Sequence, residues 1–203
     1  MYTARQTAIA AGILYLVTHV TSVVTRVVFF AGPLSGAAAD PTLVRLGVLS
    51  EVVLALAVAG TSIALYPVVR RVSEGFALGY VALRTLEAGV ILTGAVAMVA
   101  FVSLGDPSLV VLYDWTFVVG PGLICGVNTV VLAWVLYRSR LVPRFIPVLG
   151  LIGGPLVLAV NVTKVFGVFG AIESWAGVSV LPIFAWEICL AVYLIARGLR
   201  PTP

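Results

Sequence analysis

Ionisable side chains are scarce in this sequence, and their scarcity excludes whole classes of protein. Asp, Glu, Lys and Arg make up 10% of the 203 residues, against about 25% in ordinary soluble domains. Histidine occurs once, as His19, with no HxxxH or HExxH partner, although metal-dependent intramembrane enzymes need several ligands at defined spacing. The sequence therefore argues against a water-soluble domain and predicts no metal site, cofactor or catalytic residue.

Two further shortages point the same way. Cysteine occurs only as Cys125 and Cys189, both within apolar stretches, where neither a structural disulfide nor a zinc site is expected. A basic patch interleaved with aromatic residues, the mark of many nucleic-acid-binding proteins, is absent. We therefore expect no nucleic-acid partner, and we attribute the net charge of +4 to membrane topology.

Apolar residues dominate the remaining sequence. They make up 62% of the chain, the mean hydropathy is +1.18, and they come in runs of about 20 or more, as transmembrane helices require. We predict an all-α polytopic membrane protein, a six-helix transmembrane bundle forming a single domain over residues 1–203. The predicted spans are about 7–30, 45–69, 77–101, 115–137, 145–168 and 178–196.

The first span has an alternative interpretation as a signal peptide, because the small residues 37–39 resemble a cleavage site. Its apolar region is much longer than the roughly 7 to 15 residues of a signal peptide, which favours a span. The turn residues between 31 and 44 predict a loop. A second loop, at residues 105–107, is followed by a semi-apolar stretch at 109–113 and then by the fourth span. In this span Gly120, Pro121 and Gly122 should bend or loosen the helix.

Positive residues predict the orientation, because cytoplasmic loops carry an excess of Lys and Arg. With both termini cytoplasmic, the opposite side keeps only Arg45, at a helix edge, and gathers the acidic residues Asp40, Asp106, Asp114 and Glu173. The cytoplasmic segments then collect Arg5, Arg70, Arg71, Arg138, Arg140, Arg144, Arg197 and Arg200.

The third span carries two charges, Arg84 and Glu87. Each costs about 2.5 to 3.5 kcal/mol at the centre of a membrane helix, while an apolar side chain returns only about 0.3 to 0.6 kcal/mol. This helix should therefore face other helices and form the core of the bundle. At a spacing of i, i+3 the two residues can form a structural ion pair, and partners on other spans should satisfy their remaining hydrogen-bonding groups.

Other polar residues within the spans predict a binding site, since intramembrane charges usually face a cavity or one another. Tyr15, His19, Ser22 and Arg26 share one stripe of the first span. Estimated depths place the polar residues in the middle or outer part of their spans. We predict one outward-facing, ligand-binding pocket lined by Tyr15, His19, Arg26, Glu51, Asn161, Lys164 and Glu187.

Three functions compete for this polar set. The favoured one is binding or transport of a small polar or amphipathic molecule, which with membrane lipids would be the protein's partner. In the alternative, the charges form closed salt bridges in a structural or accessory subunit. An intramembrane enzyme is a weaker option, because a metal site of His19, Glu51 and Glu187 lacks a supporting motif, and Ser22 or Ser62 lacks a nucleophile elbow.

Three segments carry a family resemblance. They are ALRTLEAG at 82–89, LYRSRLVPRFIPVLGLIGG at 136–154, and the closing segment around Trp186 and Glu187 that ends in IARGL. With the six-span layout, they resemble a bacterial integral membrane family catalogued as domain of unknown function 4386. The resemblance covers nearly the whole chain and implies this fold in a bacterial inner membrane, but no activity, substrate or cofactor. Eleven Arg to one Lys also suggest a GC-rich bacterial genome.

Overall fold

The computed structural model describes residues 4–168 and 173–200, and every regular element in that part of the chain is helical. Its elements are α1 (Ala4–Val24), the π-helical η1 (Thr25–Phe29), α2 (Ala31–Leu34), α3 (Pro41–Val69), α4 (Glu74–Leu104), α5 (Ser108–Phe117), the π-helical η2 (Val118–Ile124), α6 (Cys125–Ser139), α7 (Phe145–Val165) and α8 (Glu173–Ala196).

By their length and composition, these helices are typical of a membrane protein. Within the described residues, five helical stretches are long and apolar enough to cross a membrane: Arg5–Phe29, Pro41–Val69, Glu74–Leu104, Ser108–Ser139 and Phe145–Val165. A shorter apolar helix follows at Val180–Ala196. The protein is therefore a polytopic helical bundle, and the predicted all-α fold class is confirmed.

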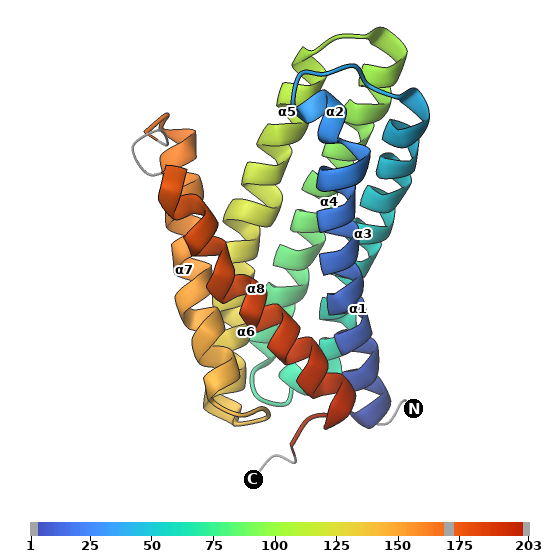
Figure 1. The fold of residues 1–203 in the computed structure, drawn as a ribbon. Helices are drawn as coiled ribbons and strands as arrows, with labels where there is room; N and C mark the ends of the chain where they lie inside the picture. Colours follow the sequence, from blue (N-terminus) through green and yellow to red (C-terminus); the bar gives the residue numbers. More distant parts are fainter. Residues whose placement is uncertain (1–3, 169–172, 201–203) are drawn as a thin grey trace.

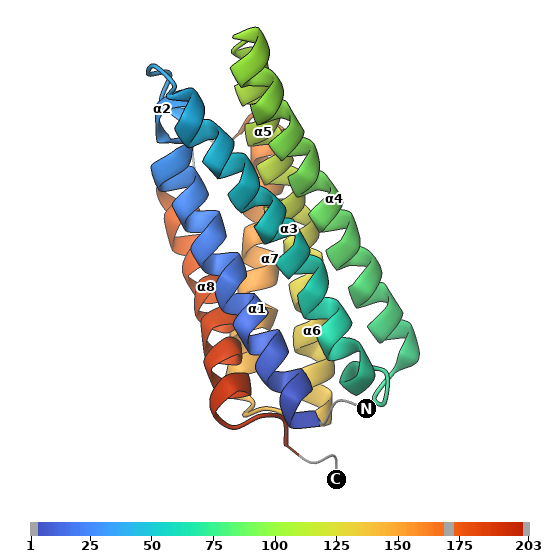
Figure 2. The same ribbon diagram turned by 90° about the vertical axis from the view of Figure 1, so that its right-hand side faces the viewer.

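The helices form one elongated bundle (Figures 1 and 2). Helix α3 packs along α1 and α4, α7 packs along α6 and α8, and α8 also contacts α1. Arg5 on α1 donates through Nη2 to the carbonyl oxygens of Ile195 (3.0 Å) and Ala196 (3.2 Å). The two termini lie at the same end of the bundle, together with the turns that follow α3 and α6 (Figures 1 and 2). We call this the terminal end and the other the distal end.

Local capping explains where α3 and α4 begin. The Asp40 carboxylate accepts from the N–H of Thr42 at 2.7 Å, and Pro41 occupies the first turn, which is a favoured arrangement at a helix start. The Ser73 hydroxyl caps α4 in the same way. Helix α3 therefore starts four residues before the predicted span, and the predicted loop at 31–44 is wrong in part, since it also contains the short helix α2.

The fourth predicted span has a different start as well. The helix begins at Ser108, so the semi-apolar stretch 109–113, which lies outside the predicted span, is part of the helix. The predicted loosening is confirmed, because the chain is π-helical over Val118–Ile124, around Pro121. A missing proline N–H removes one backbone hydrogen bond, and such π segments frequently occur at functional sites.

Candidate functional site

The charged pair on α4 contacts a third charged side chain, from α8. Arg84 donates through Nη1 to Oε2 of Glu87 and through Nη2 to Oε1 of Glu187, both at 3.3 Å. Arg84 and Glu87 are only 3% and 4% exposed. The predicted ion pair is therefore present and buried, but one guanidinium is shared between two carboxylates from different helices.

Neutral side chains complete the coordination of this ion cluster. Tyr80 accepts from Nε of Arg84 at 3.3 Å and shares a hydrogen bond of 2.7 Å with the Tyr15 hydroxyl. The guanidinium lies 5.2 Å from the centre of the Tyr15 ring, within cation–π range. Asn128 on α6 donates to Oε2 of Glu87 at 2.6 Å. Side chains from four helices, α1, α4, α6 and α8, thus meet around Arg84. The prediction that this helix faces other helices and forms the core of the bundle is wrong, because α4 also has an exposed apolar face with Leu86 (57%) and Val96 (68%).

His19 joins the cluster from α1. Its Nε2 lies 3.5 Å from Oε2 of Glu187, and its ring meets Phe184 edge-on with centroids 4.5 Å apart. Its Nδ1 lies 3.1 Å from the carbonyl oxygen of Tyr15, so donation to that oxygen leaves Nε2 facing the carboxylate. The cluster therefore brings one guanidinium and one imidazole against two carboxylates.

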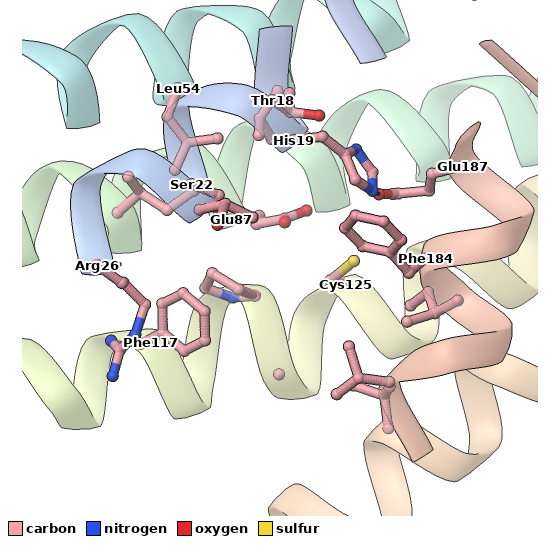
Figure 3. Close-up of a pocket in the computed structure, with 18 of the residues that line it drawn as sticks. Thr18, His19, Ser22, Arg26, Leu54, Glu87, Phe117, Cys125, Phe184 and Glu187 are labelled. Atoms are coloured by element: carbon pink, nitrogen blue, oxygen red, sulfur yellow. The ribbon is translucent and has the colours of Figure 1, made fainter. Parts of the chain in front are cut away.

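A cavity of about 420 Å³ adjoins this cluster (Figure 3). We call it the central cavity. It is lined from α1 and η1 by Thr18, His19, Ser22, Val23, Arg26 and Val27, from α3 by Leu54 and Val58, from α4 by Arg84, Glu87 and Ile91, from α5, η2 and α6 by Phe117, Pro121, Gly122 and Cys125, from α7 by Val157, Asn161 and Lys164, and from α8 by Val180, Ile183, Phe184 and Glu187.

A second polar group lies at the distal end of the cavity. Arg26 donates through Nη2 to Oδ1 of Asp114 at 2.9 Å, and its guanidinium lies 4.2 Å from the centre of the Phe117 ring. Its Nη1 is shielded from solvent and has no hydrogen-bond partner among the described residues. Lys164 and Asn161 line the cavity from α7. The cavity therefore has a polar group at each end, joined by apolar side chains from α3, α4 and α7.

Most of the residues predicted for one pocket lie around this cavity. Those that line it are His19, Arg26, Asn161, Lys164 and Glu187. Arg84 and Glu87 line it too, so the prediction that treated this ion pair as separate from the pocket is wrong. Nothing in the spacing of residues along one helix could have shown that Glu187, a hundred residues away, shares the guanidinium.

Tyr15 and Glu51 do not line the central cavity, which corrects their predicted position. Tyr15 is buried one helical turn before His19, and its hydroxyl is bonded to Tyr80. Glu51 on α3 is 3% exposed and accepts from the Tyr113 hydroxyl at 2.8 Å. That bond turns the carboxylate toward α5, beside a separate and much smaller cavity.

The three side chains of the alternative metal site, His19, Glu51 and Glu187, do not converge on one point. Glu51 lies apart from His19 and Glu187, and within the described residues no group of three His, Cys, Asp or Glu side chains could hold a metal ion. Cys125 and Cys189 are both free, and Cys125 is buried in the cavity wall. Sequence reasoning also missed Phe117 and Phe184, because apolar residues of a membrane helix carry no signal that separates a cavity wall from a lipid contact.

Comparison with known proteins gives a family and no further relative. No curated protein and no solved structure matches the chain. The model of the family described as Domain of unknown function (DUF4386) matches residues 10–198, which is nearly the whole chain. The resemblance seen in the sequence is thereby confirmed: the chain belongs to the membrane-like helical family known as Domain of unknown function (DUF4386).

Proposed function

We propose that this protein binds a small amphipathic molecule in the central cavity. The observation that carries the proposal is one cavity of about 420 Å³ with a polar group at each end and apolar side chains between. Ligand pockets are typically about 300 to 1,000 Å³, mostly apolar, with a few convergent polar groups. Buried charges inside a membrane bundle usually mark such a site.

We also propose an orientation of the bundle and the membrane that contains it. Both termini would be cytoplasmic in a bacterial inner membrane, so that the distal end with Arg26 and Lys164 lies on the extracytoplasmic side. The support is that the termini and the arginine-rich turns after α3 and α6 lie at one end of the bundle (Figures 1 and 2), as the distribution of positive charge in membrane proteins requires. Transport would need a second state open toward the terminal end.

One observation favours the alternative function of a structural or accessory subunit. Arg84 is engaged by Glu87, Glu187 and Tyr80 at once, as expected for a closed network that fixes helix order. The two functions differ in what the cavity does. A scaffold should tolerate a filled cavity, whereas a binding protein should lose its ligand.

Two tryptophan substitutions on α1 test the proposal. Ser22 lines the central cavity, so Ser22→Trp would occupy space that a ligand needs without changing a charge. Val20 is 62% exposed on the outer face of the same helix, which makes Val20→Trp the matched control. Native mass spectrometry of each purified protein would record any molecule that remains bound.

We expect a bound molecule on the wild type and on Val20→Trp, and none on Ser22→Trp. Circular dichroism would check that all three proteins keep the same helix content. A wild type without any bound molecule, together with an unchanged melting temperature of Ser22→Trp, would favour the scaffold instead.

A further inference from the structure

Part of the cavity wall is open to the outside of the bundle. Four of the lining residues are strongly exposed: Val23 (49%) and Val27 (67%) on α1 and η1, and Val180 (47%) and Phe184 (39%) on α8. All four are apolar, and the outer surface of a membrane bundle faces acyl chains. The exposed side chains therefore mark an opening between α1 and α8, which we call the lateral opening.

The path of α8 explains this opening. Near the terminal end α8 touches α1 so closely that a Cβ on Gly12 would lie 2.7 Å from the carbonyl oxygen of Ala191. Farther along α1, His19 still contacts Glu187 and Phe184 of α8. At the same level, α8 packs closely on α7, since a Cβ on Gly153 would lie 2.5 Å from the Ile183 nitrogen. Toward the distal end α8 leaves α1 and follows α7 (Figure 1).

The lateral opening lies at membrane depth. At about 1.5 Å per residue, Phe184 is roughly 18 Å from the terminal end of α8, and Val23 is roughly 28 Å from the start of α1. The hydrocarbon layer is about 30 Å thick. The opening thus spans the distal half of that layer, and Arg26 and Lys164 lie at about the level of the lipid headgroups.

The chemistry of the cavity selects an amphiphile of one charge type. Arg26, Lys164 and Asp114 give its distal end a net positive charge of one, and Nη1 of Arg26 lacks a hydrogen-bond partner among the described residues. Toward the terminal end, the cavity wall is apolar and includes Leu54 and Ile91, each only 4% exposed and therefore shielded from lipid. An acyl chain fits such a wall, and a carboxylate or phosphate fits the cations above it.

We infer that the ligand is a single-chain anionic amphiphile that enters from the bilayer through the lateral opening. Its anionic group would lie against Arg26 and Lys164, with its chain along the apolar wall. The inference rests on the proposed function and specifies the class of ligand and its route, which the proposed function leaves open.

Photolabelling of the full chain in phosphatidylcholine vesicles tests this inference. The probe is a palmitic acid with a diazirine in its chain, and labelled residues are mapped by peptide mass spectrometry. We expect adducts on Leu54 and Ile91, which lipid reaches only through the cavity, in addition to Leu56, which is 67% exposed on the outer face of α3. Val180→Trp should narrow the opening and abolish the inner adducts, whereas Val96→Trp, on the exposed face of α4, should leave them unchanged.

A second arm tests the charge. The corresponding diazirine alcohol should give far fewer inner adducts than the acid, and the double variant Arg26→Gln/Lys164→Gln should reduce labelling by the acid to the level of the alcohol. Equal inner labelling by acid and alcohol in the wild type would overturn the anionic class. Displacement of the probe by inorganic phosphate in the buffer would indicate a water-soluble anion and overturn the bilayer source.

The outcomes also separate this inference from the proposed function. If inner adducts are absent while mass spectrometry still finds a molecule that Ser22→Trp expels, entry from the bilayer is refuted and the binding function stands. If both signals are absent, both proposals fail.

Discussion

Removing Arg84 should destabilise the protein more than removing its acidic partner Glu87. Arg84 neutralises two buried carboxylates at 3.3 Å, so Arg84→Met leaves Glu87 and Glu187 without their shared cation. Breaking a buried ion pair from one side costs about 3 to 5 kcal/mol. Glu87→Gln leaves Arg84 paired with Glu187, and its cost should be about that of a hydrogen bond to a charged group, roughly 1.5 to 3 kcal/mol.

The double variant distinguishes a shared network from independent contacts. In Arg84→Met/Glu87→Gln, only the Glu187 carboxylate remains, so one buried carboxylate lacks its cation instead of the two in Arg84→Met. The combined cost should therefore fall short of the sum of the single costs by about 0.5 to 3 kcal/mol, the range seen for residues in one network.

Unfolding in mixed micelles, followed by circular dichroism during titration with sodium dodecyl sulfate, would provide the four free energies of unfolding. Equal single costs that add without coupling would refute the shared guanidinium.

Three further predictions concern the frame around the site. Reporter fusions after Arg71 and Arg144 should both give a cytoplasmic signal, and a periplasmic signal at either would refute the proposed orientation. Gly153→Ala should destabilise the bundle by about 1 to 3 kcal/mol through overpacking, since its Cβ would meet the α8 backbone; Gly89→Ala, with nothing within 4 Å of its Cβ, should not lower the melting temperature. The backbone N–H and the hydroxyl of Ser108 lower the pKa of Asp106. The stabilising effect of the Asp106 carboxylate is therefore present above the ordinary pKa of an aspartate and is lost as the pH falls through the lowered pKa. Melting temperatures of Asp106→Ala and wild type should differ at neutral pH and converge in acid.

The sequence was sufficient for the class of fold and for the buried ion pair, because both depend on composition and local spacing. Apolar runs longer than 20 residues have few alternatives to membrane helices, and Arg84 and Glu87 lie on the same helical turn. The π-helical break around Pro121 was predictable for the same reason, since a proline inside a helix removes a backbone hydrogen bond wherever the helix packs.

Rotation of each helix about its axis was not predictable. In a soluble helix a polar face indicates the outside, but here lipid-facing and protein-facing residues are equally apolar. The direction of Glu51 illustrates this, because its depth suggested the central cavity whereas its bond to Tyr113 turns it toward α5. The contact of Arg84 with Glu187 likewise depends on where the bundle places α8 relative to α4, which no single-helix pattern contains.

The most direct test of the binding function is an electron cryomicroscopy map of the protein in lipid nanodiscs, at a resolution that shows side chains. We expect elongated density in the central cavity, with its polar end within hydrogen-bonding distance of Arg26 or Lys164 and its tail pointing toward Ile91. A cavity filled by its own side chains, with α1 and α8 in contact along their whole length and no density between them, would contradict it.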